Sequence, residues 1–564
     1  MKEELIKKIA NAKAVTFDIF DTLLVRPVFR PNDVFSFIDD KYKIGSLNFR
    51  EKREKAFCDA VRRYTSEKKE EVSYEEIYNQ FEIDSLKRLK NKELEIEADI
   101  LKVNPEGKEI FDYAISEKKE VYLISDMFLP EDFIIKVLEL NGYKGYKNIY
   151  LSSRYNRLKY TGNLYKIFLI KESLLPQEVV HVGDNKQSDI LSAERIGLNT
   201  FYLMNNADKI KASFPALNTF YERNPYDLTR SVILGLFAKN ASKLDYWEKI
   251  GYLYSAPLCV SFVQWLINFS ERLQISQLLF VLRDGYSLLK CFNKIYKGDV
   301  KAVGVVAPRS ISTSFTLDFK DKLDNEFEKR DAIVTILKSF KNELIKESND
   351  FPDLGNADEC FSFYMNNQEL IKNIAENKSR AYERYLKNKA IREGKVAIVD
   401  MMTTYFSAQK LIINALSEHR DIIGLYFFVS KMRKVDRSKY EYFQQTNRFY
   451  NIPLIEFLVT APFPSVKDVS LAGEPVYREA SKQEKIRIDR FEKVLKGADK
   501  FYQDLIYEFE STGLPEFDPN SVIDLIDFFV ANPTEEDKSQ WAEIFHSWDS
   551  EHSTFVKTMD SWYK

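Results

Sequence analysis

Five side chains suited to phosphate and metal chemistry follow apolar runs in the first two hundred residues of this 564-residue chain. They are Asp18 in "TFDIFDTLLVRP", Ser125 ending "EVYLIS", Lys159 in "RLKYTGNLYK", and Asp184 and Asp189 in "HVGDNKQSD". Crowded carboxylates repel one another unless a cation lies among them, and Mg²⁺ prefers hard oxygen ligands while leaving room for a phosphate oxygen. A carboxylate can attack phosphorus, and a lysine and a hydroxyl can stabilise the developing charge. The set therefore predicts phosphoryl-transfer chemistry.

Two neighbours of these residues are further candidates. Asp126 directly follows Ser125 and Asn185 directly follows Asp184, so both are candidates for substrate contact. Taken singly, each of these residues is more often a turn former, a helix cap or a solvated side chain than part of a site. We therefore take the ordered set, and no single member of it, as the functional signal.

The apolar runs that carry these residues alternate with helical patterns. After a first strand within residues 14–24 come "EVYLIS", "NIYLSS", "EVVHVG" and "TFYLM", separated by segments such as "LPEDFIIKVLELNGY" and "GNLYKIFLIKE". This alternation predicts an α/β fold with a doubly wound parallel sheet, in which ligands bind at the carboxyl ends of the strands. Residues from about 27 to 108 have helical periodicity and no convincing strand, so a helical insertion is expected between the first two strands.

A domain boundary is predicted in "YERNPYDLTRS" (221–231), which separates a domain over 1–222 from a second over 228–564. The second domain repeats the strand–helix alternation in "QLLFVLRDGYSLLKCF", "KAVGVVAPRS", "KVAIVDMMTTYFSAQKLI" and "IIGLYFFVS". Long helical stretches separate these strands and fill residues 485–564. The pattern predicts a second α/β, helix-rich domain with a helical C-terminal region.

The second domain also places polar residues after its predicted strands. The candidates for substrate binding there are Arg283, Asp284, Arg309, Ser310, Asp400, Thr403, Thr404, Ser407 and Gln409. Arginines with a hydroxyl-rich turn that opens a helix can hold a phosphate or a sugar diphosphate. The equally strong alternative is that Asp284 and Asp400 cap helices and that Arg309 forms a structural ion pair. The turn after Asp400 is loosely similar to the ribose-phosphate loop of phosphoribosyltransferases, but it has a single acid and no glycine.

The motifs of the first domain resemble those of the haloacid dehalogenase (HAD) superfamily. "FDIFDTLL" resembles its first motif, "VYLIS" its second, Lys159 its third and "HVGDNKQSD" its fourth, in the expected order over residues 12–204. The resemblance implies an aspartyl nucleophile, Asp18, helped by Ser125 and Lys159, with a helical cap that closes over the site and selects the substrate. We expect one Mg²⁺ held by Asp18, Asp184 and Asp189, with the Phe20 carbonyl as a further ligand.

The same motifs are more narrowly similar to a bacterial branch of unassigned hydrolases that is often encoded near capsule or lipopolysaccharide synthesis. The C-terminal half resembles the uncharacterised C-terminal half of that branch. This resemblance implies a small phosphorylated metabolite, such as a sugar phosphate or nucleotide sugar, as substrate. It also makes glycan-synthesis enzymes candidate partners.

Phe20 departs from the superfamily pattern. The position two residues after the nucleophile is generally a second Asp, which protonates the leaving oxygen and later activates water. Such acid–base help is typically worth about 10²–10⁴-fold in rate. The extra acid here, Asp21, comes one residue later, and neighbouring side chains on an extended chain point different ways. We therefore expect slow turnover of ordinary phosphate monoesters and faster turnover when the leaving group is already acidic.

Composition excludes several other classes. The formal net charge is −3 with 30% charged residues, which does not favour a nucleic-acid binder. Four scattered cysteines form no CxxC pair, so neither a disulfide framework nor a zinc site is expected. The charged amphipathic N-terminus is no signal peptide, and the apolar run 253–269 contains Ser, Pro, Gln and Asn, which indicates a core helix and no membrane span. We expect a cytoplasmic protein.

Two classes of function remain open. The first is a magnesium-dependent phosphohydrolase or phosphotransferase. The second is a protein without turnover, in which the first domain binds a phosphate ligand and the second recognises a glycan-synthesis enzyme. The intact charged set favours the first class.

Overall fold

The computed structural model describes residues 3–44, 47–315, 326–348, 350–391, 394–403, 406–416, 422–429, 440–442, 452–547 and 555–561. The chain divides into two compact units. The first unit is Met1–Lys243 with Gln503–Phe517, and the second is Leu244–Tyr502 with Asp518–Lys564. The first unit therefore takes one segment from the far end of the chain, and the helix α25 (Lys482–Phe509) begins in one unit and ends in the other.

The first unit contains a five-stranded parallel sheet in the order β5-β4-β1-β6-β7. Its strands are β1 (Ala14–Phe17), β4 (Glu120–Ser125), β5 (Asn148–Leu151), β6 (Val179–Gly183) and β7 (Asn199–Tyr202). The chain builds outward from β1 through β4 to β5 and then returns to the other side of β1 to add β6. The order reverses between β1 and β6, which is the position where open α/β sheets bind ligands. The predicted doubly wound parallel sheet is confirmed.

The turn after β1 is held by the helix α7 (Pro105–Ser116). Pro105 occupies the first turn of α7, where its missing N–H costs nothing, and the Asn104 side chain caps the helix by accepting the Glu106 N–H. The Asn104 amide also donates to the Thr22 carbonyl at 2.9 Å. Gly107 lies so close to this turn that a Cβ atom would stand 2.0 Å from the Thr22 carbonyl oxygen. Glycine at this position therefore lets α7 pack against the backbone that follows Asp18.

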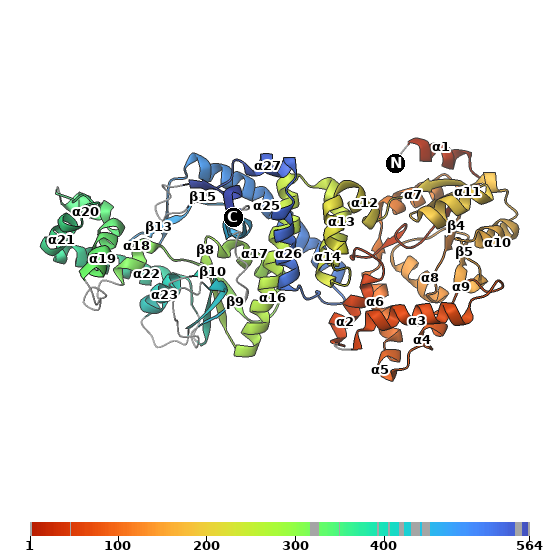
Figure 1. Cartoon of the computed structure of the whole chain (residues 1–564), viewed down its shortest axis with the longest axis horizontal. Helices are drawn as coiled ribbons and strands as arrows, with labels where there is room; N and C mark the ends of the chain where they lie inside the picture. Colours follow the sequence, from red (N-terminus) through yellow and green to blue (C-terminus); the bar gives the residue numbers. More distant parts are fainter. Residues whose placement is uncertain are drawn as a thin grey trace. The chain divides into compact units, whose positions relative to one another are not determined.

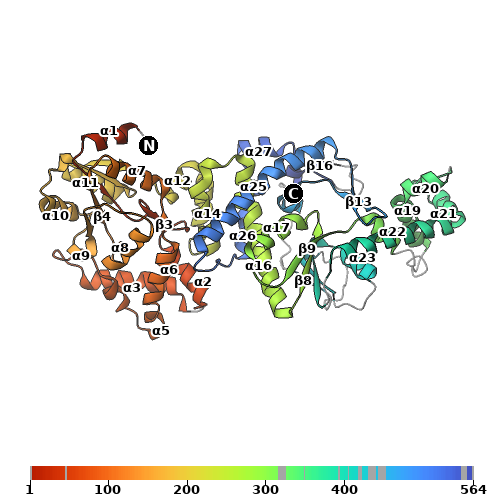
Figure 2. The same cartoon turned by 180° about the vertical axis from the view of Figure 1, so that it is seen from behind.

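A helical insertion separates β1 from β4, as the sequence predicts. It contains α2 (Asp33–Tyr42), α3 (Phe49–Tyr64), α4 (Tyr74–Tyr78), α5 (Asp84–Lys87) and α6 (Lys90–Ile100), which lie together at the lower end of this unit in Figures 1 and 2. At its base β2 (Leu24–Val25) pairs antiparallel with β3 (Lys102–Val103), a two-residue pairing that the sequence does not predict. Inside the insertion the fully buried Arg53 makes two hydrogen bonds to Glu93, at 2.9 and 3.0 Å.

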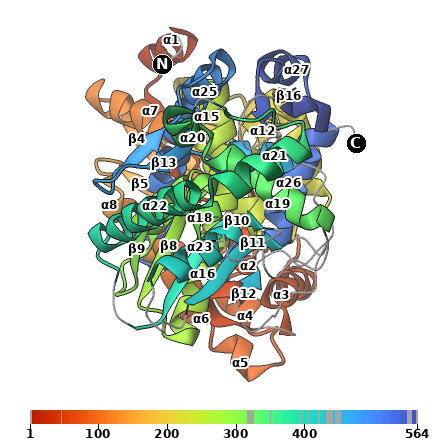
Figure 3. The same ribbon diagram turned by 90° about the vertical axis from the view of Figure 1, so that its left-hand side faces the viewer.

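The second unit contains its own parallel sheet, in the order β12-β11-β10-β8-β9. Its strands are β8 (Gln277–Leu282), β9 (Lys301–Val306), β10 (Val396–Thr403), β11 (Ile422–Val429) and β12 (Tyr440–Tyr442). Figure 3 shows β10 beside β11, with α23 (Ser407–Leu416) next to them. The chain goes from β8 to β9 and then returns to the other side of β8, so this order reverses between β8 and β10. The predicted second α/β, helix-rich region is confirmed.

The apolar run of the second unit forms the helix α16 (Ala256–Leu273), which packs against α17 (Gly285–Ile295) and α26 (Pro519–Ala531). Within the described residues, the helical stretch Tyr246–Leu273 has the length and mean hydropathy, 1.4, of a membrane span, but 83% of its most apolar window is buried inside the protein. Burial on that scale is typical of a core helix.

The end of the chain differs from its prediction. The helices α26 and α27 (Glu535–Trp541) are followed by an antiparallel pair, β15 (Phe545–Ser547) with β16 (Phe555–Lys557), where helix was expected. Phe545, Val556 and Phe555 are the aromatic and β-branched residues that favour strands.

Candidate active site

Asp18 and Asp184 stand at the point where the strand order of the first sheet reverses. Asp18 directly follows β1, and its backbone N–H donates to the Val182 carbonyl of β6 at 2.9 Å, which extends the sheet to the acid itself. Asp184 directly follows β6. Asp189 lies in the short π-helix Lys186–Leu191 that comes next. Carboxylate oxygens of all three acids lie within 4.8 Å of one another.

Lys159 lies between two of these acids. Its Nζ atom is 2.5 Å from Asp18 Oδ1 and 2.6 Å from Asp189 Oδ1, and its side chain is 2% exposed. Burial opposes the charge of Lys159, but the two carboxylates raise its pKa well above the usual value. The ammonium group therefore remains charged and binds the two acids together.

Burial raises the pKa of Asp18 to about 7. The ammonium of Lys159 opposes this increase, the charge of Asp189 adds to it, and a hydrogen bond from Ser125 opposes it again. Ser125 ends β4 and is almost fully buried. With a pKa near neutrality, a substantial fraction of Asp18 is ionised at pH 7 although the site is buried. The contact with Lys159 favours this ionised form.

Asp189 accepts hydrogen bonds through both of its oxygens. Oδ2 accepts the Asn185 N–H at 2.9 Å, whereas Oδ1 accepts from Lys159 and lies 3.3 Å from His181 Nε2. Burial raises its pKa, but Lys159 and His181 outweigh burial and hold the pKa well below the usual range. His181 is a buried core residue, as expected, and its Nδ1 is 2.8 Å from Thr16 Oγ1. Asp189 therefore fixes the position of Lys159 as well as adding charge.

Asp184 is held by two residues that the sequence does not single out. Its Oδ1 accepts from the Thr22 hydroxyl at 3.2 Å and its Oδ2 accepts from the Asn205 amide at 3.0 Å. Burial raises the pKa of Asp184 well above the usual value, and the charges of Asp21 and Asp18 raise it further. Thr22 belongs to the first motif and could have been proposed from it, whereas Asn205 caps α12 (Asn206–Ser213) and carries no sequence signal.

These residues fit a divalent cation such as Mg²⁺. The donors are hard carboxylate oxygens, and their mutual repulsion is the force that a cation would relieve. Gly183 contributes to the compactness of the group because a Cβ atom there would lie 2.4 Å from the Asp189 carboxylate. The expected ligand set, including the Phe20 carbonyl, stays a prediction.

Phe20, two residues after Asp18, has an aromatic ring that cannot donate or accept a proton. The residue is 7% exposed, and the Arg26 guanidinium lies 5.1 Å from its ring centroid. Arg26 in turn makes two hydrogen bonds to Glu97 of α6, at 2.9 and 3.1 Å. The side chain at this position therefore packs with the helical insertion.

Asp126 and Asn185, the two candidates for substrate contact, both bind backbone N–H groups. Asp126 accepts the Lys159 N–H at 2.6 Å and the Tyr160 N–H at 3.1 Å, and Asn185 accepts the N–H groups of Gln187 and Ser188. These contacts shape the loops that carry Lys159 and Asp189. Their role in substrate contact stays a prediction.

The candidates of the second unit come from one edge of its sheet. Arg283 and Asp284 follow β8, Arg309 begins α18 (Arg309–Ser314) after β9, and Thr403 ends β10. The structure describes only the backbone of Arg309 and Thr403, and Thr404 lies outside the described residues.

Three other candidates of this unit make internal contacts. The Gln409 amide oxygen accepts from the Tyr426 hydroxyl at 2.8 Å, and the Ser310 hydroxyl donates to the Lys467 carbonyl at 2.8 Å. Burial and the charge of Asp284 raise the pKa of Asp400 to about 8. Asp400 is therefore largely protonated at neutral pH.

The chain was compared with known proteins. No family model and no curated protein matches it. Among solved structures it is similar to a 2-haloacid dehalogenase from Pseudomonas syringae pv. tomato DC3000, with 16% identity over 34% of this chain and 86% of that one and a TM-score of 0.25. It is also similar to a HAD family enzyme from Bacteroides thetaiotaomicron in a magnesium complex, with 18% identity over 35% of this chain and 94% of that one and a TM-score of 0.26. A third similar structure is a HAD phosphatase from Thermococcus onnurineus, with 19% identity over 34% of this chain and 86% of that one and a TM-score of 0.24.

Proposed function

We propose that the first unit is a magnesium-dependent phosphohydrolase or phosphotransferase that acts through Asp18 on a small phosphorylated metabolite. The observation that carries the proposal is the buried contact between Asp18 and Lys159, 2.5 Å, beside Asp184 and Asp189 at the reversal point of a parallel sheet. A purely structural acid has no need of a lysine and two further acids in the same buried space. The order of the four HAD-like motifs supports the same proposal.

Asp18 is the nucleophile in this scheme. One of its oxygens attacks phosphorus, the P–O bond to the leaving group breaks, and an aspartyl-phosphate forms. Lys159 keeps the carboxylate ionised before attack and remains beside the phosphoryl oxygens as their charge develops. Ser125, at the end of the neighbouring strand, donates a hydrogen bond to the reacting groups. Water then attacks the phosphorus of the aspartyl-phosphate to release phosphate and restore Asp18.

Mg²⁺ would be held by Asp18, Asp184 and the Phe20 carbonyl. When bound, the ion neutralises negative charge on the phosphoryl group. Asp189 is also within reach of such an ion. Its oxygens, however, already accept from Lys159 and the Asn185 N–H, so we assign it mainly to positioning Lys159.

The buried Phe20 ring determines the preferred leaving group. An alkoxide leaving group needs a proton, and the residue at this position supplies none. We therefore expect slow hydrolysis of alkyl phosphates and faster hydrolysis of aryl phosphates and diphosphate-linked substrates. A long-lived aspartyl-phosphate on Asp18 is the expected consequence when water attack is also unassisted.

A series of phosphate esters with leaving groups of graded acidity, assayed with magnesium, tests this expectation. Rates should rise steeply as the leaving group becomes more acidic, and Asp18→Asn should abolish them. Phe20→Asp should raise turnover of alkyl phosphates by about 10-fold or more. Fast alkyl-phosphate hydrolysis with a flat dependence on acidity would show that another residue, Asp21 being the nearest acid in sequence, supplies the proton.

Two other functions are compatible with parts of the site. Displacement of halide at carbon needs no protonated leaving group, which is consistent with Phe20, but it gives no role to a cation. Chloride release from 2-chloropropionate in EDTA would favour it over phosphate release. A phosphate-binding protein without turnover, partnered with a glycan-synthesis enzyme, would bind phosphate with magnesium and show no burst of product. A metabolite-phosphate screen with the Asp18→Asn control separates these cases.

A cytoplasmic location and a role in capsule or lipopolysaccharide synthesis belong to the same proposal. The role in glycan synthesis rests on the resemblance of the motifs, and the location rests on the four scattered cysteines, which fit a reducing compartment. Assaying nucleotide sugars and sugar phosphates within the screen tests the second of them directly.

A further inference from the structure

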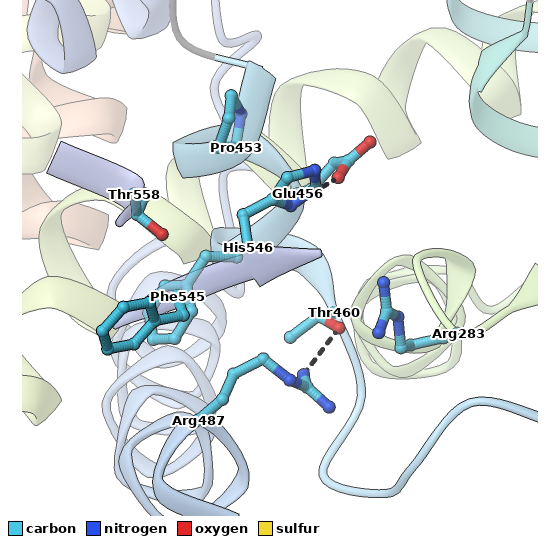
Figure 4. Close-up of a pocket in the computed structure, with 9 residues that line it drawn as sticks. Arg283, Pro453, Glu456, Thr460, Arg487, Phe545, His546 and Thr558 are labelled. Carbon is cyan, nitrogen blue, oxygen red and sulfur yellow. Dashed lines mark hydrogen bonds and ion pairs between the residues drawn. The ribbon is translucent and has the colours of Figure 1, made fainter. Parts of the chain in front are cut away.

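A small pocket in the second unit brings two arginines together. It is lined by Arg283, Pro453, Glu456, Phe457, Thr460, Arg487, Phe545, His546 and Thr558, and has a cavity volume of about 20 Å³, room for about one water molecule or one oxygen atom of a ligand. Figure 4 shows the hydrogen bond from Arg487 to the Thr460 side chain and places Arg283 in the lining of the same pocket. Arg283 comes from the end of β8, whereas Arg487 comes from α25.

The two arginines differ in how many of their donors are used. Arg487 is 9% exposed and donates to Thr460 Oγ1 at 2.9 Å and to the carbonyls of Ala461 and Phe463, each at 3.2 Å. It therefore holds the loop that forms one wall. Arg283 is 24% exposed, and its hydrogen bond is to Ser465 Oγ at 3.3 Å. Its other N–H groups have no hydrogen-bond acceptor among the residues that the structure describes.

The neighbouring acids balance charge without taking these donors. Glu484 Oε1 lies 4.0 Å from Arg283 Nη1 and 3.7 Å from Arg487 Nη2, and Asp284 Oδ1 lies 3.5 Å from Arg283 Nε. Both oxygens are buried and accept no hydrogen bond from the described part of the chain. The two guanidinium groups lie beside these carboxylate oxygens without donating hydrogen bonds to them. Their N–H groups therefore point in other directions. For Arg283 the pocket is the open direction.

The charge of Arg283 acts on two other residues of the pocket. Burial and then the charge of Arg283 together lower the pKa of Arg487 to about 10. Burial followed by Arg283 also lowers the pKa of His546, which lies 3.3 Å from Glu456. A ligand that placed negative charge beside Arg283 would relieve both effects.

We propose that this pocket binds a small oxyanion, the phosphate or carboxylate group of a metabolite, through the guanidinium group of Arg283. Arg487 and Thr460 form the wall behind the anion. The planar fork of an arginine matches the oxygens of both kinds of group, so the shared chemistry is a bidentate contact to an oxyanion. This site is separate from the acids of the first unit and does not require magnesium.

Histidine NMR separates the two units because each site has its own reporter. The chain has four histidines. His546 lines the pocket, and His181 contacts Asp189 in the first unit. Full-length protein with labelled imidazoles would be titrated in EDTA with inorganic phosphate and, in parallel, with acetate, and His546→Gln and His181→Gln would assign the signals. We expect saturable movement of the His546 signal, and the stronger of the two ligands identifies the natural class of anion.

The variants test the role of the arginine. Arg283→Gln should weaken the response of His546 at least about 10-fold, because a charge-assisted bidentate contact is lost. Arg283→Lys, which keeps the charge and loses the fork, should give an intermediate affinity and carries the test if Arg283→Gln does not fold. Arg380→Gln, at an exposed position of α22 (Gln368–Asn388), is the matched control and should bind as the wild type does.

Three outcomes would overturn the proposal. The first is movement of the His181 signal alone, which would place anion binding in the first unit. The second is no saturable movement of either signal. The third is an unchanged His546 response in both Arg283 variants, which would show that another group holds the anion.

Discussion

The two parallel sheets treat an acid near the reversal of their strand order in opposite ways. In the first unit Asp18 lies 2.5 Å from the ammonium of Lys159, so the carboxylate has a cation in direct contact although burial raises its pKa to about 7. In the second unit Asp400, on β10 beside the reversal point, accepts the Met401 N–H, and no lysine or arginine among the described residues forms an ion pair with it. Its pKa rises to about 8 through burial and the charge of Asp284.

The presence or absence of a paired cation determines what each acid can do. An acid paired with a lysine can act as a nucleophile, whereas an unpaired buried acid takes a proton and becomes a neutral hydrogen-bond donor. Contact distances follow the same division. Lys159 reaches its acids at 2.5–2.6 Å, but Arg283 stays 3.5 and 4.0 Å from Asp284 and Glu484. We infer that the first sheet is organised for chemistry and the second for holding a ligand.

The largest expected effect comes from replacing each acid with its amide, which has nearly the same size. Asp18→Asn should lower phosphohydrolase activity by at least about 10⁴-fold, because the nucleophile is lost. Asp400→Asn should leave activity within about twofold, since it replaces a protonated acid with an amide. Steady-state rates on an aryl phosphate with magnesium measure both. Comparable losses in the two variants would mean that both sheets serve one reaction.

Magnesium binding should distinguish the sheets next. Asp184→Ala should weaken magnesium affinity by more than about 10-fold, because a carboxylate ligand is lost from a group of three. Asp284→Ala, which removes an acid from the second sheet, is the control and should leave the affinity unchanged. Calorimetric titration with MgCl₂ reports both. Equal affinities of Asp184→Ala and the wild type would remove the metal site from the first unit.

The protonation state of Asp400 should appear in the stability of the second unit. Its pKa is higher in the folded than in the unfolded protein, so the folded state binds the extra proton between about pH 4 and pH 8. Asp400 therefore favours folding at low pH and loses that contribution as pH rises through this window. Asp400→Asn should be more stable than the wild type at pH 8, and its advantage should shrink by up to about 1.4 kcal/mol for each pH unit lowered towards pH 4.

Urea unfolding followed by tryptophan fluorescence measures this effect cleanly, because all five tryptophans belong to the second unit. Asp299→Asn, at an exposed position of the same unit, is the control and should run parallel to the wild type. A constant difference between Asp400→Asn and the wild type across the pH range would show that Asp400 is ionised in the folded protein.

The smallest effect concerns the helical insertion over the first sheet. Glu70, between α3 and α4, accepts from the Leu158 N–H at 2.9 Å, the Thr161 hydroxyl at 2.7 Å and the Asn163 amide at 2.6 Å. It thereby ties the insertion to the loop that carries Lys159. Glu70→Gln should loosen this tie and raise KM by about two- to fivefold through weakened hydrogen bonds.

Hydrogen–deuterium exchange of residues 65–73 would check the cause, with the exposed Glu67→Gln as control from the same loop. Exchange should rise only in the Glu70 variant. Deleting residues 27–108 would disturb the rest of the unit, because Asp33 of α2 is buried and accepts hydrogen bonds from Tyr221, Ser231 and Arg50. Unchanged exchange in Glu70→Gln would show that the insertion does not depend on this contact to stay closed.

The site residues that could be predicted from the sequence are those whose positions depend on local structure. Asp18, Ser125 and Asp184 could be placed together because parallel strands end at one edge, and each residue ends its strand or follows it directly. Lys159 could be assigned to the same edge only through the motif order. Its contact with two acids depends on the Asp126 hydrogen bonds that shape its loop, which no periodicity encodes.

Long-range assembly was beyond sequence reasoning for the same physical reason. Arg487 and His546 join Arg283 from about 200 and 260 positions away, through packing of helices and a short strand pair with no common motif. The pairing of β2 with β3 spans two residues each, too few to give an alternating pattern. The helical pattern of 485–564 likewise did not indicate that α25 ends in the first unit.

The far segment of the first unit has a consequence for how the protein is made. Gln503–Phe517 provides the Phe509 ring that packs 5.2 Å from Phe37, and the Glu508 carboxylate that pairs with Lys239 at 2.7 Å. A ribosome adding about 5–20 residues per second needs roughly 15–50 s to travel from residue 243 to residue 503. During that interval the strands around Asp18 have been synthesised, but the segment that packs against Phe37 of α2 has not. The unit whose synthesis begins first is therefore completed only after most of the second has emerged.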